Sequence, residues 1–274
     1  MTTLSEYRST SELLSNLTLR ELRSKYKRSA LGWAWSLLNP LATLLIFSLV
    51  FRFFMRVELP RSETSGLRNY ALFLSCGLLP WNFFTNGVTG SIGTLVGNAN
   101  LIKKTYFPRE LLVFSHVASW NVSLLIEMGI LLVALLAFGN MVLPWIPVML
   151  LLIALLTIFV TGLSLIFSVV NVFFRDVQHL VGIVFQAWLY LTPVIYPITL
   201  IPEKHDVLGV EVPLRQIWEL NPMARFVGAF RDALYDLRFP AFGDVAYLTV
   251  VSVATFFIGL AVFNRLSGRL AEEL

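Results

Sequence analysis

The sequence predicts an all-α integral membrane protein in which six helices cross the bilayer. Hydrophobic residues make up 57% of the 274 residues and charged residues only 14%, with a mean hydropathy of +0.73. A soluble domain carries about 25% charged residues. Several long stretches also lack charge, and a helix needs about 20 apolar residues to cross the hydrocarbon. Cys76 is the one cysteine, which excludes a disulfide framework and a thiolate metal cluster.

The N-terminal segment predicts an amphipathic helix at the membrane interface, over residues 9–28. STSE at 9–12 and TLRE at 18–21 each fit a capping box, which is a helix start signal. Leu19 and Leu22 share one helical face, and basic residues occupy the others, where they meet anionic headgroups. Two interpretations stay open: a segment that only orients the chain, or a docking surface for a partner.

Six apolar segments follow, and together they make residues 1–274 one transmembrane domain. Residues 29–51 and 69–102 carry no charge, and the apolar stretch 111–174 is divided near Gly139. We predict the spans at about 31–54, 70–96, 109–138, 146–171, 178–200 and 244–264. The first apolar run has no cleavage pattern of a secretory signal, so we expect it to be retained.

The distribution of basic residues predicts that both termini are cytoplasmic. An even number of spans places the two termini on one side of the membrane. If that side is the cytoplasm, the inner segments hold twelve Lys and Arg residues and the outer segments nine. The basic cluster before the first span adds to this bias. The sequence therefore predicts a multi-pass protein with both termini inside.

The break between the second and third predicted spans, LIKKTYFPRE, predicts a short helix and a kink over 100–108. Asn100 fits a helix cap, and the helix is expected to extend through Tyr106. Phe107 precedes a proline and should be extended, while Pro108 suits the first position of the next helix. The basic, aromatic tip is interpreted either as a cytoplasmic anchor or as a contact with a partner.

The outer segment 203–242 is too long for a simple turn and contains an amphipathic helix. Asn221 and Pro222 predict its start, with proline at the first helical position. The apolar face consists of Phe226, Val227, Phe230, Ala233 and Leu234, and the other faces hold Arg225, Arg231, Asp232 and Asp236. This helix is too charged to span a bilayer and should lie on the outer leaflet or dip into it.

The motifs of enzymes are missing from the sequence. It contains no G-x-x-x-x-G-K-[ST] phosphate loop, no G-x-S-x-G elbow, no H-E-x-x-H zinc motif and no paired cysteines. The net charge of +4 is too small to indicate a nucleic-acid-binding protein. We therefore expect no catalytic residue, no metal site and no cofactor in this chain.

One polar stripe is predicted on the third span, where His116, Trp120, Ser123 and Glu127 share a helical face. Such residues hold helices together or line a conduit, and both interpretations stay open. Glu127 is the one formal charge between residues 111 and 174. An ion- or proton-coupled transporter that uses Glu127 is therefore the alternative function. An intramembrane enzyme would need a convergent set of acidic or histidine groups, which the chain does not offer.

Four stretches together resemble a known family. They are LRSKYKRSALGWAWSLLNP before the first span, LIKKTYFPRELL, NVFFRDVQHLVGIVFQAWLYLTPVIYP and NPMARFVGAFRDALY. In this order and spacing they are similar to the membrane subunit, or permease, of ATP-binding-cassette (ABC) polysaccharide exporters of the O-antigen and teichoic-acid type. The resemblance covers nearly the whole chain.

The resemblance implies a homodimer in the bacterial cytoplasmic membrane with two separate ATPase subunits, which bind ATP and Mg. The two permease copies would enclose a channel for a lipid-linked polysaccharide, in contact with membrane lipids. The segment 100–108 would couple to the ATPase, and external gate helices would lie within 203–242. The implied coupling residues are Asn100, Ile102, Lys103, Lys104, Tyr106, Phe107, Pro108, Arg175 and Asp176. The channel candidates are Trp81, Phe84, Glu127, Trp188 and Tyr190, and the gate candidates are Asn221, Pro222, Arg225, Phe226 and Phe230.

Overall fold

The computed structural model describes most of the chain after residue 65 and one helix before it. The described residues are 4–25, 34, 38, 41–42, 45–46, 49–50, 62, 64, 66–105, 107–198, 205–207, 210–212, 215, 218 and 220–274. The predicted first span, at about 31–54, therefore lies largely outside the described residues, and Tyr106 lies outside them entirely.

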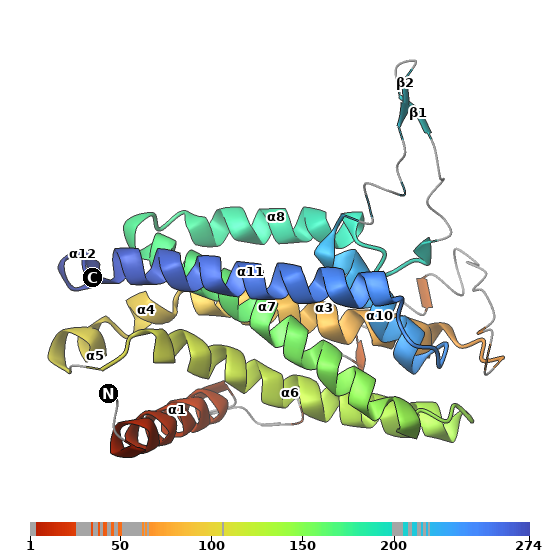
Figure 1. Ribbon diagram of the computed structural model, residues 1–274, viewed down its shortest axis with the longest axis horizontal. Coiled ribbons are helices and arrows are strands. Elements are labelled where there is room, and N and C mark those ends of the chain that lie inside the picture. The colour runs from red at the N-terminus through yellow and green to blue at the C-terminus, as the bar shows by residue number, and fades with distance from the viewer. Residues whose placement is uncertain are drawn as a thin grey trace.

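The described residues form a helical bundle with short elements at its two ends (Figure 1). The long helices of the bundle are α3 (Tyr70–Ile92), α6 (Glu110–Ala137), α7 (Ile146–Phe173), α8 (Val177–Leu191) and α11 (Phe242–Ser267). One end carries α1 (Leu4–Lys25), α4 (Thr94–Gly97), α5 (Ala99–Lys104) and α12 (Leu270–Glu273). We call this end the α5 end. At the other end lies α10 (Pro222–Leu234), and a 3₁₀ turn, η3 (Leu143–Trp145), leads into α7.

The predicted helical class is confirmed, with one short β-hairpin added. The hairpin lies in the outer segment and pairs β1 (His205–Val207) with β2 (Val210–Val212) in antiparallel register, His205 opposite Val212. Among the described residues, three helices are long and apolar enough to cross a membrane: Glu110–Ala137, Leu143–Phe173 and Phe242–Ser267. Val177–Leu191 is apolar but shorter. The count of six spans stays a prediction.

Helix α3 occupies the centre of the bundle, which explains its polar side chains. Seventeen of its 23 residues are buried, and it packs against α6, α7, α8 and α10. Its hydroxyls bond back to the carbonyl one turn earlier, as Ser75 does to Ala71 (2.7 Å) and Ser91 to Gly87 (2.6 Å). A hydroxyl satisfied within its own helix can be buried without a second partner. In contrast, α11 buries only four of its 26 residues, and it is long and apolar enough to cross a membrane.

Helices α7 and α11 are in close contact because two glycines face each other. A Cβ on Gly162 would lie 2.6 Å from the carbonyl carbon of Thr255, and one on Gly259 would overlap the carbonyl oxygen of Gly162. Small residues at such a crossing let the two backbones approach closely. The tight crossing of α7 and α11 therefore depends on this glycine pair.

Two apolar cores hold the bundle together. The larger surrounds α3 and includes residues of α6, α7, α8, α10 and α11. A smaller core, the end core, lies at the α5 end, where fully or nearly fully buried side chains come from seven helices. Its members include Leu17, Ile102, Leu111, Leu112, Phe263 and Leu270. The end core joins the short helices α1, α5 and α12 to the long helices.

Two predicted helix boundaries were wrong. Helix α1 starts at Leu4 rather than near residue 9 and is continuous through 18–21, where Thr18 Oγ1 donates to Leu14 O (2.8 Å) instead of capping a new start. Helix α8 ends at Leu191 rather than near residue 200. Thr192 is extended (φ −110°, ψ 132°) because it precedes Pro193, and a residue before proline disfavours the helical region.

Replacing Gly259 with leucine should lower the unfolding temperature. The leucine side chain would have to displace the α7 backbone, and overpacking of this kind costs about 1–3 kcal/mol. The measurement is the reaction of a thiol-specific fluorophore with Cys76 on heating, because this cysteine is the only one and is fully buried. Gly129→Leu is the control, since nothing lies within 4 Å of a Cβ at Gly129. Equal unfolding temperatures for the two variants would contradict the prediction.

Candidate functional site

The short helix α5 presents two exposed lysines at the α5 end of the bundle. It runs from Ala99 to Lys104 and ends with Lys103 and Lys104, whose charges are favourable at a helix C-terminus. Ile102 points the other way and is only 5% exposed, within the end core. The helix therefore has an apolar side that fixes it to the bundle and a basic side that faces outward.

The local structure around α5 differs from the prediction in three respects. The helix ends at Lys104, before an extended Thr105 (φ −136°, ψ 135°), and not at Tyr106 as predicted. Asn98 rather than Asn100 occupies the N-cap, and its side chain makes no capping bond, so Asn100 lies inside the helix. Pro108 does not open the next helix, because α6 begins at Glu110. Phe107, the residue before the proline, is half-buried against the end core.

A groove of about 810 Å³ lies beside α5. It is lined by eight described residues between Ile102 and Glu110, and by Ser267 and Gly268 at the end of α11. The guanidinium of Arg109 donates a hydrogen bond to the carbonyl of Ser267, and this bond links the two segments that line the groove. The groove thus combines the predicted coupling segment with a second segment, far away in the sequence, that the sequence did not indicate.

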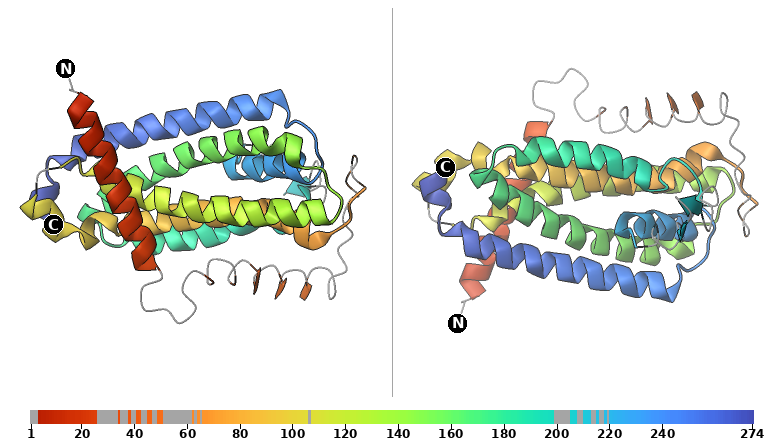
Figure 2. Two further views of the ribbon diagram at one scale, coloured as in Figure 1. Left: turned by 90° about the horizontal axis from the view of Figure 1, so that it is seen from below. Right: turned by 90° about the horizontal axis from the view of Figure 1, so that it is seen from above.

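Helix α1 is tied to the start of α5 by one hydrogen bond. Arg20 Nη2 donates to Asn98 Oδ1 at 2.9 Å, and Asn98 in turn donates to Thr94 O. Leu17 and Leu22 of α1 are buried, and Figure 2 shows α1 crossing the bundle at the end where α5 lies. The N-terminal helix and the candidate coupling helix are therefore in direct contact.

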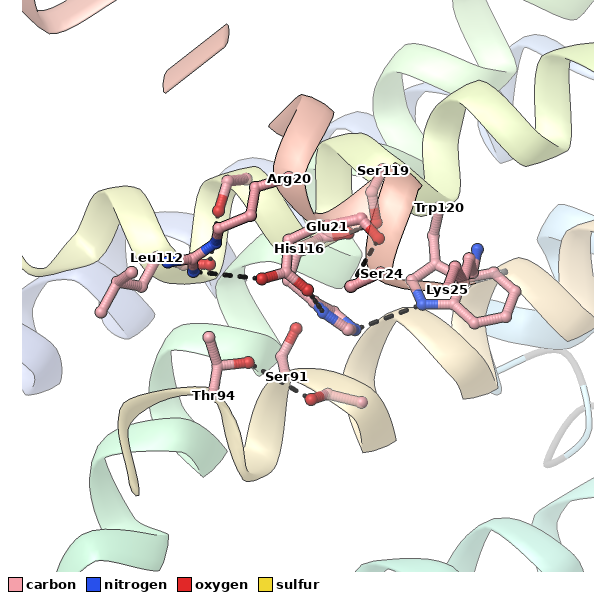
Figure 3. Close-up of polar contacts among 12 residues, drawn as sticks. Arg20, Glu21, Ser24, Lys25, Ser91, Thr94, Leu112, His116, Ser119 and Trp120 are labelled. Carbon is pink, nitrogen blue, oxygen red and sulfur yellow. Dashed lines mark hydrogen bonds and ion pairs between the residues drawn. The ribbon is translucent and has the colours of Figure 1, made fainter. Parts of the chain in front are cut away.

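A polar contact between α1 and α6 lies next to this bond (Figure 3). Glu21 Oε2 lies 3.6 Å from His116 Nδ1, and Trp120 Nε1 donates to His116 Nε2 at 3.2 Å. Because Nε2 accepts, the ring proton of the neutral imidazole is on Nδ1, toward Glu21. A Cβ on Gly90 of α3 would overlap the imidazole, so this glycine makes room for His116. Hydrogen bonding to His116 lowers the pKa of Glu21, with Arg20 adding to this and burial opposing it.

Lys25, the last residue of α1, occupies the next part of the predicted polar stripe. Its ammonium lies 3.0 Å from the Trp120 ring centroid and donates to Ser123 Oγ at 3.0 Å. Burial lowers the pKa of Lys25 to about 8, while the charge of Glu127 acts in the opposite direction. Three members of the stripe therefore contact α1 directly, and Glu127 interacts with it electrostatically.

The turn between α7 and α8 lies at the α5 end as well (Figure 1). It contains Arg175 and Asp176, both exposed. Asp176 occupies the N-cap position of α8, where its carbonyl accepts from Leu180 N and its side chain makes no capping bond. The predicted coupling residues outside α5 are thus on the same end of the bundle as the groove.

The aromatic channel candidates differ in their exposure. Trp81 and Phe84 are 4% and 0% exposed, in a ring cluster in which the Phe84 centroid lies 5.3 Å from Trp188 and 4.8 Å from Phe185. Trp188 is half-buried, and Tyr190 is 65% exposed. Glu127 is half-buried on α6. In this conformation Tyr190 is the aromatic candidate with a large free surface.

The predicted start of α10 is confirmed. Asn221 caps the helix by accepting from Met223 N and Ala224 N, and Pro222 occupies its first turn. Asn221 also accepts from Trp188 Nε1 at 2.9 Å, which joins α10 to α8. Arg225 pairs with Asp244 of α11 at 2.7 Å. The apolar face packs inward, with Phe226 and Phe230 fully buried.

Arg231 was predicted on a polar face of an amphipathic helix, apart from the apolar face, but its side chain is buried. It is 6% exposed and donates to the carbonyls of Pro193 and Val194, both at 2.5 Å, with its guanidinium 3.8 Å from the Phe73 ring centroid. These carbonyls became available where α8 stops at Thr192. The helical pattern alone did not indicate that the chain beyond α8 turns back toward α10.

The fold and these sites define a class: a polytopic helical membrane protein. In the part of the chain that the structure describes, no group of three or more His, Cys, Asp or Glu side chains is arranged to hold a metal ion. The sequence matches the family described as ABC-2 type transporter over residues 12–235. The chain belongs to this family.

Several relatives extend over nearly the whole chain. The O-antigen export system permease protein RfbA of Klebsiella pneumoniae is 33% identical over 266 residues, which cover 96% of this chain and 95% of the relative. The protein of the same name from Myxococcus xanthus is 29% identical, with the same coverage. The polysialic acid transport protein KpsM of Escherichia coli is 24% identical over 90% of this chain and 91% of its own length.

The contact of Glu21 with His116 predicts a measurable effect on α1. Glu21→Gln should speed amide hydrogen exchange in α1 at neutral pH, because a partly buried hydrogen-bonded pair contributes about 0.5–1.5 kcal/mol. The folded-state pKa of Glu21 is lowered, so its contribution is present above the ordinary carboxyl range and is lost as the pH falls through the lowered value. The difference between the two proteins should therefore shrink in acid. Arg23→Gln, an exposed change two residues away, should leave exchange in α1 unchanged.

Proposed function

We propose that this chain is the permease subunit of an ATP-driven exporter that moves a lipid-linked polysaccharide across the bacterial inner membrane. One observation carries the proposal: similarity over 96% of the chain to proteins named as O-antigen export permeases. The similarity to KpsM, named for polysialic acid transport, supports the same substrate class. Two copies of the chain would form the channel, and two separate subunits would hydrolyse ATP.

The α5 end supports coupling to an ATPase. Three basic side chains line the groove, Lys103, Lys104 and Arg109, and the exposed turn with Arg175 and Asp176 lies at the same end. Burial of Ile102 attaches α5 to the bundle, so a partner that binds α5 would also act on the long helices. This end would face the cytoplasm with both termini, in agreement with the excess of basic residues in the segments assigned to that side.

The substrate path is proposed along α8. Its large apolar side chains are exposed in the single chain, among them Ile183 (67%) and Tyr190 (65%). Lipid would cover such a surface in an isolated membrane protein, and we propose that a second copy or the transported molecule covers it in the exporter. Trp188, Asn221 and Thr192 connect this helix to α10, which we propose as part of the external gate. Tyr190 is the proposed aromatic contact for a sugar ring.

The ion- or proton-coupled alternative is not favoured. That alternative depended on Glu127. The negative charge of Glu127 stabilises the ammonium of Lys25, at the end of α1. A carboxylate that balances a nearby ammonium has a structural reason to lie in the membrane. Similarity to named export permeases adds no support for ion coupling.

Exchanging the two lysines of α5 for glutamate should uncouple the permease from its ATPase. The double variant Lys103→Glu/Lys104→Glu would place acidic groups where we propose that acidic partner groups dock, and association should weaken by roughly tenfold or more. The measurement is co-purification of the cognate ATP-binding subunit, together with polysaccharide export in cells.

The double variant Lys103→Arg/Lys104→Arg is the matched control and should retain both association and export. Unchanged thermal exposure of Cys76 would show that the glutamate variant is folded. Full export by the glutamate variant, or export by the purified permease without any ATP-binding subunit, would contradict the proposal.

A further inference from the structure

The groove beside α5 has a second wall, and we infer that this wall is part of the docking surface for the ATPase. The second wall, called the C-terminal wall below, consists of Ser267 and Gly268 at the end of α11, directly before α12. We infer further that the groove receives a segment of the ATP-binding subunit that carries an apolar side chain with acidic neighbours. The inference rests on the proposed function. It adds a second contact between the permease and the ATP-binding subunit, beside the one made by α5.

The geometry brings the two walls together from distant parts of the chain. Ser267 and Gly268 line the same groove as Lys103 and Phe107. Arg109 bonds to the carbonyl of Ser267, and α12 contacts α5 directly. Figure 1 shows α12 and α5 at the same end of the bundle. A partner that touches α5 from the groove side therefore meets the C-terminal wall as well.

The two walls are anchored in the same apolar core. Leu270 of α12 is fully buried and Ile102 of α5 nearly so, and both belong to the end core together with Phe263 of α11. The short helices α5 and α12, on the two sides of the groove, are thus held by the same apolar core.

The charge of the groove specifies its occupant. Three lining residues are basic, Lys103, Lys104 and Arg109, and Glu110 is the one acidic residue of the described lining. Arg265 and Arg269 are exposed on either side of the C-terminal wall, and the exposed acidic Glu273 lies further along, at the end of α12. Such a surface attracts acidic partner groups and disfavours basic ones. Ile102 and Phe107 add apolar surface, so the occupant combines carboxylates with an apolar anchor.

The size of the groove agrees with a protein segment. About 810 Å³ is in the upper part of the range in which proteins bind whole ligands, roughly 300–1,000 Å³, and exceeds what one side chain fills. A turn of helix with several side chains fits such a volume. The groove is continuous with the exposed lysines of α5. The ATP-binding subunit proposed to bind those lysines would therefore also reach the groove.

Site-specific cross-linking tests the second wall. Cys76 is the only native cysteine and is 0% exposed, so single cysteines can be added to the native chain and labelled with a photoreactive maleimide. Ser267→Cys probes the C-terminal wall, Thr105→Cys probes the α5 wall, and Gly243→Cys probes the far end of α11. Each variant is assembled with the cognate ATP-binding subunit in lipid vesicles, irradiated and analysed by mass spectrometry.

The outcomes separate the inference from the proposed function. Cross-links to an acidic segment of the ATP-binding subunit from both Ser267→Cys and Thr105→Cys, with none from Gly243→Cys, are expected. A cross-link from Thr105→Cys alone would overturn the second wall and leave the proposed function intact. Absence of cross-links from both groove positions would count against the proposed ATPase contact itself.

A groove-filling variant gives an independent measurement. Nothing lies within 4 Å of a Cβ at Gly268, whose φ of −58° suits any side chain, so Gly268→Trp would project into the groove without straining the fold. Its affinity for the ATP-binding subunit should fall by roughly tenfold or more, the loss expected when an interface anchor is excluded. Gly243→Trp, at an equally open site on the far end of α11, should bind normally. Normal binding by Gly268→Trp would overturn the inference.

Discussion

The burial of Ile102 in the end core is the contact on which the candidate site depends. Helix α5 has only six residues, and a helix that short is not stable in isolation. Its shape and direction come from the apolar side chains beneath it and from the bond between Arg20 and Asn98. A lysine pair on a loosely held turn could bind a partner, but it could not pass a displacement to the long helices. The end core therefore fixes the direction of α5 relative to the long helices.

The position of each helix relative to the lipid explains which helices carry polar side chains and which are apolar. Protein surrounds α3, which therefore tolerates hydroxyls that bond within their own helix, whereas α11 shows most of its surface to the exterior and is more apolar. The close crossing at Gly162 and Gly259 follows from the same constraint. Since lipid provides no hydrophobic drive between helices, close backbone packing supplies the attraction that holds α11 to α7.

The sequence predicted the features that depend on neighbouring residues. It missed those that depend on contacts between segments far apart in the chain. Asn221 and Pro222 specify their helix start through capping and proline geometry, and the structure has this start as predicted. The residues around Arg231 in its helix do not indicate that it binds the carbonyls of Pro193 and Val194, which are about forty positions earlier in the chain. The C-terminal wall of the groove was missed for the same reason, because Ser267 and Gly268 form no motif. The aromatic candidates show a third limit, since an aromatic near a helix end packs inward as Trp81 does or outward as Tyr190 does.

The polar stripe on α6 gains a physical explanation from its partners. A stripe that lined a conduit would leave its polar groups available to a substrate, but Trp120 and Ser123 bind Lys25, and His116 faces Glu21. These contacts connect α6 to α1, and Arg20 connects α1 to the start of α5. A displacement of α5 would therefore reach α6 by two routes, through the chain at 105–110 and through α1. Polar contacts suit the second route, because hydrogen bonds fix direction and register more tightly than apolar packing does.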